Sequence, residues 1–168
     1  MTGALPAAVA AARGAPGTYE ELYRAEFPAL AGYCLRLTGD EQAARDAAQE
    51  ALTRLFVRFR TVASPRPWLY TVATNLCRDG WAKRTRDQDA ARRVGIELAG
   101  AALPGPDSTV RDAVDRLPAR LRSAVLLHYY ADLRIEDVAL ALNVPAGTVK
   151  RRLHEARTIL AKTLGGTS

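Results

Sequence analysis

The stretch IEDVALALNVPAGTVKRRLHEAR, residues 135–157, predicts two helices joined by a tight turn. Before the turn, apolar residues recur at helical spacing, at Ile135, Val138, Ala139 and Leu142. Asn143 tolerates turn geometry, and Pro145 disfavours helix at Val144 and can itself open the next helix. After the turn, a second apolar stripe consists of Val149, Leu153, Ala156 and Leu160. This pattern is typical of a helix-turn-helix.

The polar side of the second helix is basic. It carries Thr148, Lys150, Arg151, Arg152, His154 and Arg157. A basic second helix suits insertion into the DNA major groove, where base edges can be read. The pattern also fits an ordinary helical hairpin with solvated lysine and arginine side chains, because chance matches to such motifs are common. Both interpretations remain open on this stretch alone.

The composition of the whole chain is that of a basic globular protein. Of its 168 residues, 48% are hydrophobic and 25% are charged, and the formal net charge is +6. Such a charge favours a polyanionic partner. No apolar run is long enough to cross a bilayer, and the Ala-rich start lacks the basic residues of a signal peptide. We therefore expect no membrane insertion.

Residues that could carry chemistry are few. The only histidines, His128 and His154, lie on different predicted helices without a nearby cysteine cluster, so the sequence predicts no metal site. Cys34 and Cys77 form no CxxC motif and lie on apolar helical faces. We interpret them as core residues of a reducing compartment, with a regulatory disulfide between them as the alternative. The sequence shows no catalytic constellation and no cofactor motif, so we expect a protein that is not an enzyme.

Residues upstream of the helix-turn-helix predict further helices. An Ala-, Gly- and Pro-rich tail over 1–17 is expected to be disordered. Thr18 then resembles a helix cap, followed by an apolar face and by Pro28, which could bend or split the helix. That face consists of Tyr23, Phe27, Leu30, Cys34 and Leu37.

A second helix is expected over 41–59, after Thr38-Gly39-Asp40, which predicts a break and a new helix cap. Its apolar stripe consists of Ala44, Ala48, Leu52, Leu55, Phe56 and Phe59. Another face, spaced by three and four residues, carries Asp46, Gln49, Glu50 and Thr53. This acidic and amide face is either solvated, with Glu50 pairing with Arg54, or a docking surface for a basic protein partner.

A loop is expected over 60–67, because Pro65 and Pro67 remove backbone donors, and a helix over 68–86. The core stripe of this helix is predicted as Leu69, Val72, Ala73 and Leu76. Aromatic rings beside cations on its other faces fit the stacking of unpaired bases, although Trp68, Tyr70 and Trp81 could instead fill the core. The candidate residues are Arg60, Ser64, Arg66, Trp68, Asn75, Arg78, Trp81, Lys83 and Arg84.

The segment 87–109 loses its periodicity and gains glycine and proline, which predicts a linker, with a part over 88–98 that could be helical. Beyond it the chain becomes periodic again. The residues expected to face inward are Val110, Val114, Leu117, Leu121, Ala124, Val125 and His128.

Taken together, the motifs resemble a known family. DAAQEALTRLFVRF (46–59) and PWLYTVATNLCRDGWAKR (67–84) resemble region 2 of bacterial RNA polymerase sigma factors, and LPARLRSAVLLHYYADLRIEDVALALNVPAGTVKRRLHEAR (117–157) resembles region 4. A short linker with nothing else between them is similar to the extracytoplasmic-function (ECF) subgroup of the sigma-70 family. The resemblance implies an all-α fold of two small helical domains, over 18–86 and 110–168, joined by a flexible linker.

The resemblance also implies roles and partners. Asp46, Gln49, Glu50 and Thr53 would bind the clamp helices of the polymerase largest subunit, and the candidate residues between Arg60 and Arg84 would capture unpaired minus-ten bases. The basic face of the helix-turn-helix would read the minus-35 element. The expected partners are core RNA polymerase, through its clamp helices and flap, promoter DNA and an anti-sigma factor, in the cytoplasm. A helix-turn-helix regulator that acts without polymerase is the alternative.

Overall fold

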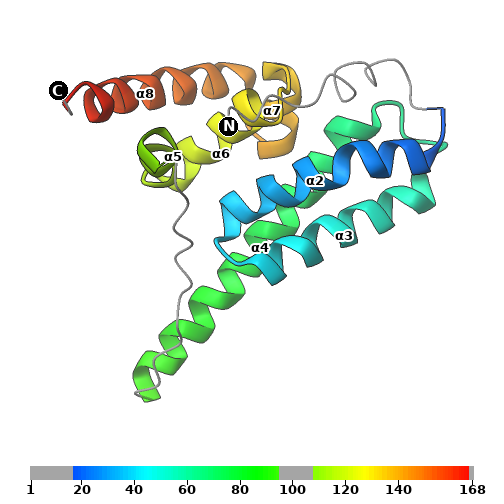
Figure 1. Cartoon of the computed structure of the whole chain (residues 1–168), viewed down its shortest axis with the longest axis horizontal. Coiled ribbons are helices and arrows are strands. Elements are labelled where there is room, and N and C mark those ends of the chain that lie inside the picture. The colour runs from blue at the N-terminus through cyan, green and yellow to red at the C-terminus, as the bar shows by residue number, and fades with distance from the viewer. Residues whose placement is uncertain (1–16, 95–107, 167–168) are drawn as a thin grey trace.

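The computed structural model describes residues 17–94 and 108–166, and the side chains of 17–80 and 109–166. Within these ranges all regular secondary structure is helical, as the sequence predicts (Figure 1). Helices α2, α3 and α4 form an N-terminal unit, and helices α5 to α8 form a C-terminal unit that includes the helix-turn-helix. The tail over 1–16 lies outside the described residues.

The N-terminal unit begins with two capped helices. Helix α2 (Tyr19–Thr38) is capped by Thr18, whose side chain accepts a hydrogen bond from the Glu21 amide at 3.2 Å. Helix α3 (Glu41–Arg58) is capped in the same way by Asp40, which accepts from the Ala43 amide. Gly39 separates them with a φ of 69°, a left-handed conformation that favours glycine. Pro28 lies inside α2, which neither splits nor ends there.

Helix α4 (Pro65–Val94) begins earlier and continues further than the sequence predicts. Pro65 and Pro67 lie in its first turn, where missing amide donors cost no intrahelical bond, so the predicted loop over 60–67 is wrong at its end. The predicted linker is helical from 87 to 94, and residues 95–107 lie outside the described ranges. In Figure 1 the C-terminal part of α4 extends well past α2 and α3.

The core of the N-terminal unit corrects two predicted faces. In α4 the fully buried residues are Leu69, Tyr70, Ala73 and Thr74, with Cys77 almost as buried, so the core face is rotated away from Val72 and Leu76. In α3 the predicted stripe is buried as far as Leu55, whereas Phe56 is 64% exposed. Tyr33 on α2 donates to or accepts from Thr74 at 2.8 Å, which satisfies both hydroxyl groups in this core.

The C-terminal unit places the helix-turn-helix on a short helical base. The base consists of α5 (Ser108–Asp115), α6 (Ala119–Val125) and the single π-helical turn η1 (Leu126–Tyr130). Helices α7 (Ile135–Leu142) and α8 (Ala146–Gly165) follow and pack on α6 and on each other. Of the residues expected to face inward here, Val110 is 59% exposed and His128 is half-buried; the others are buried.

The two units contact each other directly. Helix α4 packs against α7, and Arg36 of α2 lies 3.1 Å from Asp115 of α5. Gly32 of α2 contacts the Tyr130 ring so closely that a Cβ atom there would collide with the tyrosine hydroxyl. The units are therefore held together by polar as well as apolar contacts.

Two further sequence expectations concern the whole chain. No described helix combines the length and the apolar character needed to span a membrane. Cys34 and Cys77 are both free and buried, which agrees with their interpretation as core residues. A hydrogen bond with Cys77, together with burial, raises the pKa of the Cys34 thiol far above its ordinary value, so this thiol stays protonated and unreactive.

Candidate nucleic-acid and polymerase interface

The helix-turn-helix is built by a tight turn at Asn143. Its φ of 53° reverses the chain, and its amide is within hydrogen-bonding range of the carbonyls of Ala139 and Leu140, which closes the end of α7. Pro145 precedes the first residue of α8, as the sequence predicts. The turn thus fixes the angle at which α8 leaves α7.

Helix α8 turns one face inward and one outward. Val149, Leu153 and Ala156 are buried, whereas Lys150, Arg151, His154 and Arg157 are exposed and Thr148 is half-buried. Arg157 donates to the Tyr129 hydroxyl at 2.8 Å, and this hydrogen bond orients its guanidinium toward η1. The exposed face therefore combines hydrogen-bond donors with positive charge, the chemistry that reads and anchors duplex DNA.

Two charged residues of α8 do not share that outward face. Arg152 is half-buried and turns toward Arg78 of α4, although the sequence predicts it on the same face as the other basic residues. Glu155 is paired with Arg120 of α6 by two hydrogen bonds of 3.0 and 2.8 Å. This pairing lowers the pKa of Glu155 and neutralises an acid on an otherwise basic helix.

The residues predicted for unpaired bases are only partly gathered. Arg60, Ser64, Asn75 and Arg78 are exposed, and Trp68 is half-buried. The loop between α3 and α4 carries the first two, and α4 carries the rest. The side chains of Trp81, Lys83 and Arg84 lie outside the described residues, although their backbone belongs to α4.

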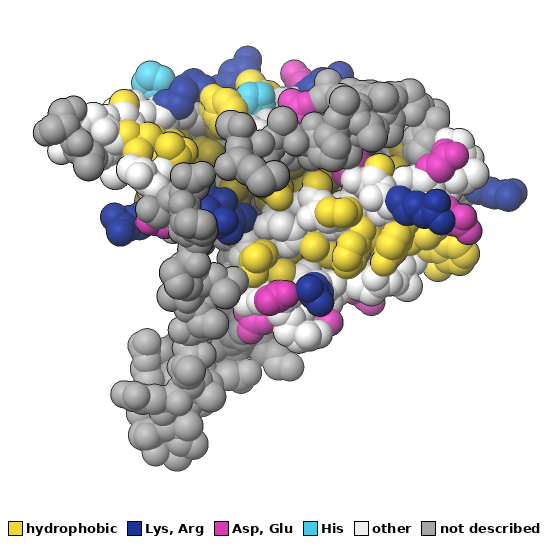
Figure 2. All heavy atoms as spheres, in the orientation of Figure 1, with side chains coloured by type: hydrophobic (Ala, Val, Ile, Leu, Met, Phe, Trp, Pro, Cys, Tyr) yellow, Lys and Arg dark blue, Asp and Glu magenta, His cyan; other side chains and the backbone are white. Residues whose placement is uncertain are grey.

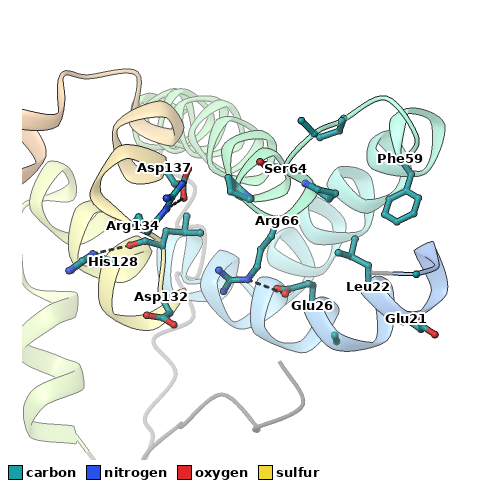
Figure 3. Close-up of a pocket in the computed structure, with 17 residues that line it drawn as sticks. Glu21, Leu22, Glu26, Phe59, Ser64, Arg66, His128, Asp132, Arg134 and Asp137 are labelled. Atoms are coloured by element: carbon teal, nitrogen blue, oxygen red, sulfur yellow. Dashed lines mark hydrogen bonds and ion pairs between the residues drawn. The ribbon is translucent and has the colours of Figure 1, made fainter. Parts of the chain in front are cut away.

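Arg66 is the exception, because the structure takes it out of the exposed loop. It lies in the first turn of α4, and its Nε donates to Glu26 Oε1 of α2 at 3.0 Å (Figure 3). Its Nη2 donates to the Ala131 carbonyl of the C-terminal unit, and its guanidinium lies 5.3 Å from the centre of the Tyr70 ring. Arg66 therefore connects the two units, a role that the sequence does not predict.

The carboxylate that Arg66 contacts is unusually buried. The Glu26 side chain is 3% exposed, and its Oε2 has no hydrogen-bond partner among the described residues. Burial raises the pKa of Glu26, and the charge and hydrogen bond of Arg66 oppose that rise without cancelling it. The pair is thus a buried ion pair at the junction between the units.

A cavity of about 840 Å³ opens beside this pair. It lies between the α3–α4 segment and the start of α7, and Figure 3 shows Glu26, Ser64 and Arg66 on one side and Asp132 and Arg134 on the other. Ser64 is thereby placed at a hollow of ligand size. The exposed Arg60 is not among the residues that line it.

The predicted docking face on α3 is exposed as a whole. Tyr23 donates to Gln49 Oε1 at 2.9 Å, and Gln42 donates to Asp46 at 2.9 Å. Glu50 accepts from Arg54 at 2.8 Å, which is the solvated pairing considered from the sequence. Such an exposed pair contributes only a few tenths of a kcal/mol, so it leaves the carboxylate available to a stronger partner.

Apolar residues continue this face, and sequence reasoning missed them. Phe56 is 64% exposed and Val57 is 81% exposed, one turn beyond Thr53. Tyr19 packs edge-on against Phe56 with ring centres 5.0 Å apart, and Figure 2 shows hydrophobic side chains gathered over α2 and α3. A mixed polar and apolar surface of this kind is typical of a protein interface. The signal in the sequence is Val57, a large apolar residue that lies outside the predicted apolar stripe of this helix.

The described residues include two candidate binding surfaces. They contain no group of three or more His, Cys, Asp or Glu side chains that could hold a metal ion. The two surfaces of note are the basic face of α8 and the mixed face of α3.

Comparison with known families matches both units. The family described as sigma-70 region 2 matches residues 22–87, and the family described as sigma-70 region 4 matches residues 108–160. The two matches follow each other in the order expected from the sequence.

Individual relatives match across both units. The chain is 31% identical over 150 residues to the ECF RNA polymerase sigma factor SigW of Bacillus subtilis, covering 78% of this chain and 80% of the relative. It is 33% identical over 158 residues to SigL of Mycobacterium tuberculosis, covering 85% and 86%. Among solved structures it is similar to the sigma factor RpoE of Bartonella quintana in complex with the anti-sigma factor NepR, with a TM-score of 0.75, 21% identity and coverage of 89% and 98%.

Proposed function

Since the chain belongs to the ECF group of RNA polymerase sigma factors, which direct RNA polymerase to promoters, we propose that its two units divide this work between duplex and unpaired DNA. The C-terminal unit reads the minus-35 element and the N-terminal unit binds the minus-ten element and the polymerase. The observation that carries this proposal is the outward face of α8, where basic side chains stand opposite a buried stripe.

The recognition helix α8 binds the major groove. Thr148, Lys150, Arg151 and His154 contact base edges and nearby phosphates, and Arg157 anchors the backbone. Arg152 is also expected to contribute, although it is half-buried and does not lie on this outward face. Tyr129 supports the phosphate contact because it holds the Arg157 guanidinium in place.

The N-terminal unit holds an unpaired base of the non-template strand. Arg60 and Ser64 in the α3–α4 loop and Asn75 and Arg78 on α4 supply donors and positive charge, and Trp68 supplies an aromatic surface. Trp81, Lys83 and Arg84, whose side chains lie outside the described residues, are expected to take part in this binding. Capture of a flipped base offsets part of the few kcal/mol that unstacking costs, which favours the open duplex.

Polymerase docks on the mixed face of α3. Asp46, Gln49, Glu50 and Thr53 receive the basic clamp helices of the largest subunit, and Phe56 supplies the apolar centre of the contact. The C-terminal unit contacts the flap. The linker passes toward the active-site channel, although residues 95–107 lie outside the described ranges.

An anti-sigma factor binds the chain and keeps it inactive. Support comes from the similar sigma factor RpoE, which was solved in complex with the anti-sigma factor NepR. The chain works without a cofactor and without catalysis of its own, in the cytoplasm where polymerase and DNA are found. The alternative of a regulator that acts without polymerase is not favoured, because the relatives named above are sigma factors over both units.

Run-off transcription tests this proposal. Purified chain is added to sigma-free core polymerase on a library of promoter templates, and transcripts with a defined start site are expected. A matched reaction with a Lys150→Ala, Arg151→Ala variant should lose transcripts from templates that depend on the minus-35 element. The absence of start-site-specific transcripts on every template would contradict the proposal.

A further inference from the structure

A second cleft lies between the two units, and arginines dominate its lining. It measures about 380 Å³ and forms where the end of α2, the middle of α4 and helices α6, α7 and α8 meet. Its lining includes Arg78, Arg120, Arg122 and Arg152, together with the apolar Leu37, Leu142 and Val144. None of the described residues that line this cleft is acidic. We call it the arginine cleft.

The positive charge of the arginine cleft is only partly compensated. Arg120 is paired with Glu155 at its edge. Arg122 donates through Nη1 to the Asp115 carbonyl at 2.8 Å, but its Nε is buried without a partner among the described residues. Among the described residues, neither Arg78 nor Arg152 makes an ion pair or a side-chain hydrogen bond. At least two guanidinium groups thus remain available to a ligand.

The surroundings of Arg152 favour an anionic ligand. Burial and the positive charges of Arg120, Arg78 and Arg151 all lower its pKa, and no acidic side chain opposes them. Like charges held together in a partly dry cleft are unfavourable, and a bound anion relieves them. Guanidinium groups are planar forks that match phosphate oxygens two at a time. Several forks around one hollow suit a ligand with more than one phosphate.

We propose that the arginine cleft binds a linear oligophosphate group, free or carried by a nucleotide, and that the ligand ties α4 to α6 and α8. The volume of the cleft lies within the range of roughly 300–1,000 Å³ that small-molecule sites occupy. Leu37, Leu142 and Val144 offer apolar contact to a base or sugar where the phosphates are carried by a nucleotide. This inference goes beyond the proposed function and does not depend on it.

The test titrates the full-length chain with sodium triphosphate, ATP or GTP at constant ionic strength. Calorimetry and ³¹P NMR line broadening are expected to show saturable binding at one site per chain. Arg152→Gln and Arg78→Gln should each raise the Kd about ten-fold, the loss expected for one charge-assisted interaction. Arg122→Gln should do the same if circular dichroism shows that it folds.

A matched control separates the cleft from the overall charge. Arg45 on α3 pairs with Glu41 and does not line the cleft, and Arg45→Gln removes the same single charge. Its Kd should stay within about two-fold of the unsubstituted chain. An equal loss in Arg45→Gln and Arg152→Gln would show non-specific attraction and overturn the proposal.

The ligands themselves separate the remaining outcomes. Tighter binding of a nucleotide identifies an organic carrier, and equal binding of inorganic triphosphate identifies the phosphate chain alone; both results support the site. Failure of all three phosphates to bind overturns it. Binding of a DNA duplex that triphosphate does not reproduce also overturns it, because Arg78 and Arg152 would then serve the DNA surface only.

Discussion

Arg66 Nε lies 3.0 Å from the buried Glu26 Oε1, and the same guanidinium donates to the Ala131 carbonyl of the other unit. One side chain thus pairs with one oxygen of a buried acid in the N-terminal unit and with a backbone acceptor in the C-terminal unit. Because Arg66 is also a candidate for binding the minus-ten strand, the arrangement of the units decides whether it is available.

The first prediction concerns the stability of this pair. Arg66→Ala should lower the free energy of unfolding by about 3 kcal/mol, because it leaves the Glu26 carboxylate buried without a counter-charge. Adding Glu26→Gln to the same chain should recover most of the loss. Urea unfolding followed by circular dichroism measures both effects, and a double variant that is no more stable than Arg66→Ala would contradict the explanation.

The second prediction concerns pH. Because the pKa of Glu26 is raised in the folded chain, the folded state keeps a proton that the unfolded state has already lost. The contribution of this group is therefore most favourable below the ordinary carboxyl pKa and is lost as the pH rises through the raised pKa. Glu26→Gln should remove that loss, so its stability relative to the unsubstituted chain should increase with pH over this window. Parallel stability curves for the two proteins would rule out the assignment.

The third prediction concerns duplex DNA. Lys150→Ala with Arg151→Ala should weaken duplex binding and make its dependence on salt shallower, by about one unit of slope for each phosphate that the variant no longer binds. Core polymerase binding should be unchanged, because α3 lies elsewhere. Arg45→Ala with Lys162→Ala removes two exposed charges outside the recognition surface and serves as the control. Fluorescence anisotropy across a salt series measures the slopes, and simultaneous loss of polymerase binding would mean that the faces are wrongly assigned.

The fourth prediction concerns polymerase docking by the acidic part of α3. Glu50→Lys should weaken binding to core polymerase, because it places a like charge against the basic clamp helices. Glu41→Lys is a closely matched control, since Glu41 also pairs with an arginine four residues on. Biolayer interferometry with immobilised core enzyme compares them. Equal affinities of the two variants for core polymerase would mean that Glu50 is solvated and does not contact the polymerase.

The fifth prediction separates the surface and core residues of the same helix. Phe56→Ser should change stability by less than about 1 kcal/mol and still weaken polymerase binding, because the ring is mostly exposed. Leu52→Ala, by contrast, empties a fully buried position and should cost about 2–5 kcal/mol. Thermal unfolding and the same binding assay measure both. If Phe56→Ser binds polymerase as well as the unsubstituted chain, Phe56 is not the apolar centre of the interface.

Features set by neighbouring residues could be predicted from the sequence. The caps at Thr18 and Asp40 and the turn at Asn143 each depend on a side chain or backbone conformation within a few residues, and all three are present. The start of α4 is misplaced by the sequence pattern because proline usually marks a break, although the first turn of a helix accepts it. Phe56 is misplaced because a stripe drawn over many turns drifts from the true buried face of a helix.

Features that join distant parts of the chain could not be predicted in this way. Arg66 and Ala131 are 65 residues apart, and Arg120 and Glu155 are 35 residues apart. No periodicity relates such positions, so the sequence predicts that the residues are charged but not which partners they find. The inward turn of Arg152 is another such case, since it depends on α4 of the other unit.

The link between Arg66 and Ala131 has a kinetic consequence. Moving the units apart breaks the bond from Arg66 Nη2 to the Ala131 carbonyl, while Arg66 Nε stays paired with Glu26 of its own unit. Any agent that keeps the units together therefore limits the access of a melted strand to Arg66 without covering the side chain. The effect of such an agent would appear in the rate of strand capture and not in the affinity for intact duplex.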